Sequence, residues 1–511
     1  MSVADGTDAP ASGRLQRPIF DRISLGALAL TGASALRLAL QFVMMPVLAR
    51  LIGPSEYGLV ALAMPFVLLA NVLADGGLSL ALGRQPTVSR EVESTAFWVA
   101  ASAGASLAAF CALAAFPLGF FMHQPRLPRL VLALAPILLM NSLAATSNGR
   151  IVRERRLAVF AAGDLIAAAT AAVAAFIAAV NGLGAWSLVA QQLVLWTCKL
   201  SWVSLKAGVR VKPVFRWAET RALVQLGLHT LGASIADFIS RNMDNLIVGA
   251  VLGSTKLGYY AMAYQIIRIP DMLIAGPFFY YILTAVSRTA HRGRREDMHR
   301  LAVAGFRLAS TAVAPLFCGL ALVADLAVPV LLGHKWLGAI PALRCLAGAG
   351  VCFCMYTLMV AMLIGLGRSA LQVRMSGLLG LTTILTVAAA SPFGVTAVSA
   401  ALALGVAAVS VIYLHKIAAN LGMPRAPLLR ALLPAACGAA VMAAAVGLTR
   451  HALAHASAPT TLVASIIVGA CTYIAVVALL AGRSLGASLR EFNAAHAEIP
   501  PEDPQALGQA A

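Results

Sequence analysis

The chain has 511 residues, of which 60% are hydrophobic and only 11% are charged. Soluble domains usually carry about 25% charged and about 45–50% apolar residues. A water-soluble fold could not bury this much apolar surface, so the composition predicts an integral membrane protein. The net charge of +18 would indicate nucleic-acid binding in a soluble protein, and its meaning here depends on where the basic residues lie.

The apolar stretches are long and do not alternate with polar residues, which favours membrane-spanning helices over barrel strands. We therefore predict an all-α polytopic membrane protein with about fourteen transmembrane helices. In chain order, the predicted spans are 24–49, 57–83, 94–121, 130–149, 157–180, 182–205, 222–252, 257–287, 301–332, 339–365, 371–390, 395–414, 431–449 and 459–482.

The basic residues divide unevenly between the two sides that this span order defines. The termini and the even-numbered connections carry 25 of the 38 Lys and Arg residues, and the odd-numbered connections carry 6. Since cytoplasmic loops hold the Lys/Arg excess, both termini are predicted to be cytoplasmic. The basic segment 206–221 is predicted to lie on the cytoplasmic leaflet and to bind anionic membrane lipids, so nucleic acid is not an expected partner.

An internal repeat relates two parts of the chain at a constant offset of 200 residues. Gly32-Ala33-Ser34 matches Gly232-Ala233-Ser234, and Gly53 and Gly58 match Gly253 and Gly258. An even number of spans separates the copies, so the repeat is parallel. We therefore expect a cytoplasmic N-terminal tail at 1–22, a first six-helix lobe at 23–205, a linker at 206–221, a second six-helix lobe at 222–415, two further helices within 428–482 and a cytoplasmic tail at 483–511.

Ionisable and strongly polar residues interrupt the apolar pattern mainly in the first two spans of each lobe. A charge at the bilayer centre costs about 2.5–3.5 kcal/mol on insertion scales, so such residues usually face a cavity or a partner. The residues concerned are Arg37 and Gln41 in the first span, Asp75 in the second, Asp237, Arg241, Asp244 and Asn245 in the seventh, and Tyr264, Arg268 and Asp271 in the eighth.

Two interpretations of these residues stay open. Asp237 with Arg241, and Arg268 with Asp271, have the helical spacing of structural ion pairs. Alternatively, the residues line a central cavity in which Arg37, Gln41, Arg241, Asn245, Tyr264 and Arg268 bind the substrate. Asp75, Asp237, Asp244 and Asp271 then couple ions or pair at the lobe interface. The concentration of polar residues on four helices favours the cavity, because apolar residues would pack the same space at lower cost.

The kind of cargo follows from the residue types. Arginine presents a planar, permanently charged fork that suits phosphate. The chain has no phosphate-binding GxxxxGK[ST] motif, and its eight cysteines lie in apolar stretches without histidines at ligand spacing. We expect no cofactor and no metal, and transport driven by an ion gradient or by the substrate's own gradient.

Two blocks resemble a known family. LARLIGPSEYGLVALAMPFVLLANVLADGGLSLAL (Leu48–Leu82) and ISRNMDNLIVGAVLGSTKLGYYAMAYQIIRIP (Ile239–Pro270) are similar to polysaccharide exporters, the Wzx-like lipid-linked oligosaccharide flippases of the multidrug/oligosaccharidyl-lipid/polysaccharide (MOP) exporter superfamily. The resemblance implies alternating access between two lobes, as in MATE transporters, and a bacterial inner-membrane location. It also implies an undecaprenyl-diphosphate-linked repeat unit as cargo for exopolysaccharide, capsule or O-antigen (lipopolysaccharide) synthesis, with the polymerase and export machinery as candidate partners. By position, the family's cationic cavity maps to Arg37, Arg241 and Arg268.

Two other functions compete with this one. An ion-coupled multidrug extruder would share the fold, but three arginines would repel organic cations. A membrane-embedded glycan polymerase or ligase would need a large outer loop with positioned acids and bases, and the odd-numbered connections are short. The sequence therefore predicts a transporter and not an enzyme.

Overall fold

In the computed structural model, the described residues are 17–75, 79, 82, 85, 88–154, 156–209, 211–214, 216–292 and 295–497. Within the helices, the side chains of residues 17–31, 34, 72, 74, 75, 157, 217–237, 239–241, 291, 292 and 493–497 lie outside the described part.

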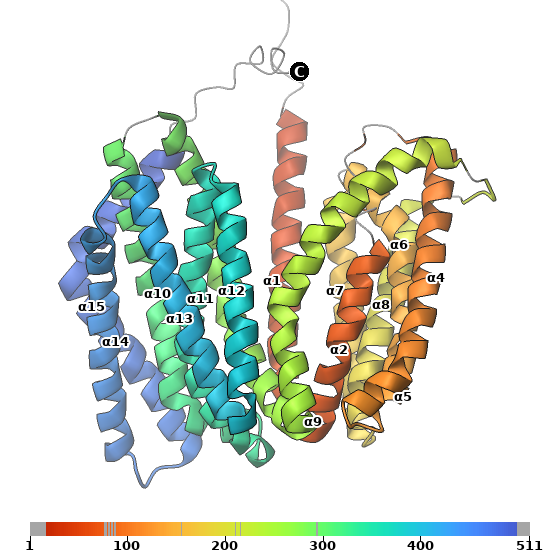
Figure 1. The fold of residues 1–511 in the computed structure, drawn as a ribbon. Coiled ribbons are helices and arrows are strands. Elements are labelled where there is room, and N and C mark those ends of the chain that lie inside the picture. The colour runs from red at the N-terminus through yellow and green to blue at the C-terminus, as the bar shows by residue number, and fades with distance from the viewer. Residues whose placement is uncertain are drawn as a thin grey trace, which may run out of the picture. The chain divides into compact units, whose positions relative to one another are not determined.

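The described part of the chain is helical and contains no strand (Figure 1). The α-helices are α1 (Arg17–Leu51), α2 (Pro54–Asp75), α4 (Arg90–Phe121), α5 (Leu127–Leu134), α6 (Pro136–Arg153), α7 (Leu157–Val180), α8 (Ala185–Ala207), α9 (Trp217–Arg292), α10 (Arg295–Leu331), α11 (Ile340–Gly365), α12 (Ser369–Ala390), α13 (Val395–Leu421), α14 (Ala426–Ala452) and α15 (Ala458–Ala497). Two short 3₁₀ helices, η1 (His334–Ala339) and η2 (Ser391–Phe393), precede α11 and α13.

Ten segments of the described chain are long and apolar enough to cross a membrane. Many large apolar side chains on these helices are exposed, among them Phe120, Leu404 and Leu479, as expected for surfaces that face lipid. The predicted fold class, an all-α polytopic membrane protein, is therefore confirmed. The number of fourteen spans stays a prediction.

Helix α9 is interrupted at Gly253, where φ is 80° and ψ is 174°. A positive φ is accessible to glycine because it lacks a Cβ atom. The interruption falls between the seventh and eighth predicted spans, 222–252 and 257–287. The chain therefore forms two successive helical segments here, and residues well separated along α9 can pack against each other.

The chain divides into two compact units, which are described separately. Unit 1 comprises residues 1–51, 66–118 and 127–235, and unit 2 comprises 52–65, 119–126 and 236–511. In unit 1, α7 packs against α8 and α1, and α6 packs against α8. In unit 2, α10 packs against α11, α14 and α15, while α13 packs against α11 and α12. The predicted lobe boundaries stay a prediction.

The two repeats meet within unit 2 in a reciprocal contact. A Cβ atom added at Gly58 would lie 1.7 Å from the carbonyl oxygen of Ser254, and one added at Gly258 would lie 2.0 Å from that of Pro54. Gly58 and Gly258, like Pro54 and Ser254, are related by the 200-residue offset. The close approach of the two backbones therefore explains why both copies of the repeat carry glycine here.

Several odd-numbered connections gather at the same end of unit 2. Arg126, after the third predicted span, donates a 2.9 Å hydrogen bond to Glu56, which follows the first span. Tyr57 and Tyr259 each place their ring edge-on to Trp336 of η1, with centroids 5.6 and 6.4 Å apart. Connections that the charge distribution assigns to one side of the membrane thus lie together in this unit.

Candidate functional site

Among the predicted site residues whose side chains the structure describes, Asp244 of α9 is the most deeply buried carboxylate. Its side chain is almost fully buried. The hydroxyl of Tyr260 donates a 2.8 Å hydrogen bond to Asp244 Oδ2, and the backbone N–H of Asn245 donates a 2.8 Å bond to Oδ1. Tyr260 stands beyond the interruption at Gly253, so the bond joins the two segments of α9.

Aromatic side chains extend this contact towards α11. The rings of Tyr260 and Tyr264 lie 5.9 Å apart in a tilted arrangement, and Tyr264 meets Phe353 edge-on at 6.5 Å. Beside Asp244, the side-chain oxygen Oδ1 of Asn245 is buried without a hydrogen-bond partner. A buried acceptor of this kind is able to bind a polar ligand group.

No lysine or arginine nitrogen among the described residues lies within 4 Å of the Asp244 carboxylate. Arg241 stands one helical turn earlier on α9, and its side chain is outside the described part. Burying a carboxylate ion in a membrane protein is costly unless a cation or a proton compensates its charge. The described contacts of Asp244 are therefore two hydrogen bonds from neutral donors in a buried setting.

A second carboxylate faces α11 further along α9. The buried thiol of Cys354 donates a hydrogen bond to Asp271 Oδ1, with Sγ and Oδ1 3.2 Å apart. Arg268 is exposed and, within the described residues, has no carboxylate within 4 Å. The structural ion pair considered for Arg268 and Asp271 is therefore not formed.

The remaining predicted site residues lie on other parts of the chain. Arg37 and Gln41 belong to α1 in unit 1, where Arg37 is half-buried and Gln41 is exposed. Asp75 ends α2, and Asp237 stands on α9, but the side chains of both are outside the described residues. The structure thus joins Asp244 to Tyr260 and Tyr264, and it leaves the wider set of predicted cavity residues as a prediction.

Cys354 and Phe353 are contact residues that the sequence did not single out. Both lie in an unbroken apolar stretch, where a cysteine is most often a small packing residue. Tyr260 stands four residues before Tyr264 in the eighth predicted span, and this helical spacing is the sequence signal that points to it. No group of His, Cys, Asp and Glu suited to holding a metal ion occurs in the part of the chain that the structure describes.

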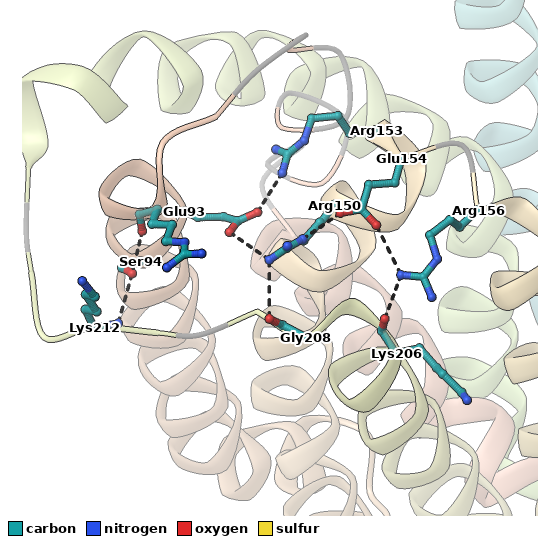
Figure 2. A network of polar contacts seen from close by, with 10 residues as sticks. Glu93, Ser94, Arg150, Arg153, Glu154, Arg156, Lys206, Gly208 and Lys212 are labelled. Atoms are coloured by element: carbon teal, nitrogen blue, oxygen red, sulfur yellow. Dashed lines mark hydrogen bonds and ion pairs between the residues drawn. The ribbon is translucent and has the colours of Figure 1, made fainter.

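Unit 1 contains a different kind of polar cluster, shown in Figure 2. Glu93, in the first turn of α4, is buried and accepts a 2.9 Å hydrogen bond from Arg153 Nη2, and Arg150 Nη1 lies 3.5 Å from its other oxygen. Arg150 Nε also contacts Glu154 at 2.9 Å, and Arg156 bridges Glu154 and the backbone oxygen of Lys206.

The same cluster holds the linker that follows α8. The backbone N–H of Lys212 donates a 3.1 Å hydrogen bond to Ser94 Oγ, and the indole N–H of Trp98 donates one of 3.1 Å to the Lys212 oxygen. The hydrogen bond from Arg150 holds the pKa of Glu154 below its usual range. The even-numbered connections after the second, fourth and sixth predicted spans thus meet in one network of paired charges, which ties helix ends together.

Comparison with known proteins shows the family to which this chain belongs. The family model described as "Polysaccharide biosynthesis protein" matches residues 47–341, which include both blocks of the predicted resemblance. The chain is 28% identical over 312 residues to the succinoglycan biosynthesis transport protein ExoT of Rhizobium meliloti (strain 1021), covering 60% of this chain and 62% of the relative. It is 24% identical over 330 residues to the lipopolysaccharide biosynthesis protein WzxC of Escherichia coli (strain K12), covering 62% and 65%. These matches thus span less than two thirds of either relative.

Solved structures share the fold at low sequence identity. The lipid II flippase MurJ in an inward closed conformation matches with a TM-score of 0.73 and 13% identity, covering 89% of this chain and 99% of that one. An inward-facing MATE multidrug transporter of the MOP superfamily matches with a TM-score of 0.60 and 14% identity, covering 75% and 94%. The resemblance to Wzx-like flippases is confirmed, and the chain belongs to the polysaccharide biosynthesis protein family.

Proposed function

We propose that this protein is a flippase that moves an undecaprenyl-diphosphate-linked oligosaccharide repeat unit across the bacterial inner membrane by alternating access. The cargo would serve exopolysaccharide, capsule or O-antigen synthesis. The observation that carries the proposal is the family match over residues 47–341, which include the buried Asp244 contact. The names of the relatives, a succinoglycan transport protein and a lipopolysaccharide biosynthesis protein, support the same class of cargo.

The proposal includes a topology with both termini in the cytoplasm. Its support is the excess of basic residues in the even-numbered connections. Three of these connections meet in the unit 1 network around Glu93, and several odd-numbered ones meet around Trp336 in unit 2. Each group is consistent with one side of the membrane.

In the proposed mechanism, arginines bind the diphosphate and carboxylates supply the coupling. Arg37, Arg241 and Arg268 would engage the phosphates, because a guanidinium donates two parallel hydrogen bonds to such oxygens. Gln41, Asn245 and Tyr264 would contact sugar hydroxyls, and the unpartnered Oδ1 of Asn245 supports an acceptor role.

Asp244 is the proposed coupling carboxylate. Its burial and its lack of a described cation make its charge state sensitive to the bound proton or ion. Asp75, Asp237 and Asp271 are retained as further coupling or interface residues. Taking up a proton or a cation would remove the cost of the buried charge and favour one of the two access states.

The protein is proposed to act without catalytic chemistry and without a cofactor, handing its cargo to a polysaccharide polymerase and export machinery. An ion-coupled multidrug extruder is the alternative, favoured only by the fold likeness to a MATE transporter. That likeness is weaker than the one to the lipid II flippase, and the relatives' names concern polysaccharides.

The proposal can be tested in a strain that lacks the gene and any redundant exporter. We expect deletion to trap lipid-linked oligosaccharide on the inner leaflet, and the wild-type gene to restore export. Arg268→Ala should fail to restore it, while Arg430→Ala, which removes an exposed arginine of α14, should succeed. Normal export in the deletion strain would overturn the proposed function. Loss of drug resistance with normal export would favour the extruder.

A further inference from the structure

Unit 2 contains a pocket of about 310 Å³ far along the chain from the Asp244 contact. Its walls come from the start of α10, the α13–α14 connection and the end of α15. This volume lies at the lower end of the range of small-ligand pockets, about 300–1,000 Å³. Its lining includes His299, Arg300, Val303, Arg307, Met423 and Ala487.

Arg307 provides a fixed cation in this pocket. Its Nη1 donates hydrogen bonds of 3.2 Å to the Ser484 backbone oxygen and 3.3 Å to Ser488 Oγ, so α15 holds the guanidinium in place. Its Nε is buried and has no hydrogen-bond partner. Within the described residues, no carboxylate lies within 4 Å of this guanidinium. A buried donor without a partner is costly, and the guanidinium as a whole is the lining group suited to an anionic ligand.

The rest of the lining suits an amphiphilic anion. Arg300 lies 3.6 Å from the exposed Glu296 carboxylate. Among the described lining residues, the charge without a carboxylate partner therefore comes from Arg307, and Glu491 contributes one negative charge. The His299 Nε2 lies 2.8 Å from the Leu421 backbone oxygen and must donate its proton there, since a carbonyl can only accept. Val303, Met423 and Pro427 supply apolar walls. A pocket with apolar walls and an arginine at its bottom favours binding of a phosphate group attached to a hydrocarbon chain over binding of a free phosphate ion.

The depth of the pocket along the helices places it at the membrane surface. From Leu331, the far end of α10, to Arg307 the chain rises about 36 Å at about 1.5 Å per residue. From Ala458, the start of α15, to Ser488 it rises about 45 Å. The hydrocarbon core is about 30 Å thick, and the bilayer with its headgroups is about 40–45 Å thick. Arg307 and Ser488 therefore lie at the level of the headgroups.

We infer that this pocket binds the phosphate headgroup of an anionic phospholipid from the leaflet at this end of unit 2. Basic pockets between transmembrane helices are a recurring form of site for anionic headgroups. The guanidinium of Arg307 binds the phosphate oxygens through charge-assisted hydrogen bonds, and the apolar walls receive the first part of the acyl region. The site is separate from the proposed cargo path and does not depend on the proposed function.

Native mass spectrometry of the full-length protein in neutral detergent tests this inference, with phosphatidylglycerol as the probe. Arg307→Ala should weaken phosphatidylglycerol binding about tenfold or more, because charged hydrogen bonds are lost. Ala487→Trp, which fills the exposed rim of the pocket, should weaken it similarly while leaving Arg307 in place. The matched control is Arg490→Ala, which removes an exposed arginine of α15 outside the pocket and should change binding less than about twofold.

The second arm uses inorganic phosphate in place of lipid. We expect the spectra to show no bound phosphate at concentrations where phosphatidylglycerol stays bound to the protein. Equal lipid binding by Arg307→Ala and Arg490→Ala would overturn the inference, and so would equal binding by wild type and Ala487→Trp. Binding of phosphate as strong as that of the lipid would also overturn it, because the site would then take a soluble anion. If Arg307→Ala fails to fold, Ala487→Trp decides the result.

Discussion

Two carboxylates of this protein are buried to nearly the same extent but have different hydrogen-bond and charge partners. Glu93 of unit 1 and Asp244 of unit 2 are 5% and 3% exposed. Glu93 accepts contacts from Arg150 and Arg153, whereas Asp244 accepts hydrogen bonds from the hydroxyl of Tyr260 and a backbone N–H.

We propose that this difference separates a structural charge from one that responds to a bound proton or ion. Two guanidinium groups contact Glu93, so this buried carboxylate is paired and ties helix ends together. Asp244 receives its hydrogen bonds from neutral donors, and we propose that its charge responds to a bound proton or ion. In this proposal, two equally buried carboxylates have different roles because their surroundings differ.

The largest expected effect comes from Asp244→Asn, which keeps the shape and removes the ionisable group. We expect transport to fall about a hundredfold, as for loss of an essential charged group worth roughly 3 kcal/mol. The melting temperature should stay close to that of the wild type. Transport assays in vesicles and thermal unfolding of the purified protein measure the two effects. Wild-type transport by this variant would remove Asp244 from the coupling mechanism.

Glu93→Ala should show the converse behaviour. It leaves Arg153 and Arg150 without their buried partner, and breaking such a pair costs about 3 kcal/mol. We expect a clear drop in melting temperature, with near-normal transport per folded molecule. Glu296→Ala, which removes an exposed carboxylate of α10, is the control and should have little effect. A stable but inactive Glu93→Ala protein would contradict the division of roles.

Tyr260→Phe sharpens the comparison within the Asp244 contact. The change removes one hydrogen bond to a buried carboxylate, worth about 1–3 kcal/mol, and should lower transport about tenfold. Tyr280→Phe removes the hydroxyl of an exposed tyrosine of α9 and serves as the control. Equal activity of the two variants would show that the Tyr260 hydroxyl has no part in coupling.

The smallest expected effect concerns the outer part of the unit 1 network. The pKa of Glu154 is lowered in the folded protein, so its contribution to stability is present above the unfolded-state pKa of about 4.3 and is lost as pH falls through the folded value. Thermal unfolding of wild type and Glu154→Gln should differ slightly at pH 7. The difference should vanish as the carboxylate protonates in acid, and a constant difference down to pH 3 would contradict the assignment.

The sequence was informative where a signal is local or periodic. Long apolar stretches predicted the helices. The predicted boundary between the seventh and eighth spans coincides with the interruption of α9 at Gly253. The 200-residue repeat predicted equivalent positions, and Gly58 and Gly258 pack against each other's repeat. The quoted blocks at 48–82 and 239–270 were sufficient to identify the family.

Contacts between distant residues could not be predicted in this way. Arg268 and Asp271 have the spacing of an ion pair, but Asp271 contacts the Cys354 thiol on α11 instead. Glu93 and Arg153 are 60 residues apart, so no local spacing in the sequence predicts that they form a pair. Only the packing of helices against each other decides which polar group a buried carboxylate meets.

The central claim is tested most directly by measuring translocation of a fluorescent undecaprenyl-diphosphate-linked oligosaccharide in proteoliposomes that contain only this protein. We predict that wild-type protein makes the inner-leaflet lipid available to a membrane-impermeant quencher faster than spontaneous flipping does in empty liposomes. We also predict that Asp244→Asn abolishes the difference and that Glu93→Ala retains it per folded molecule. Translocation no faster than in empty liposomes, with the protein folded and an ion gradient applied, would contradict the account.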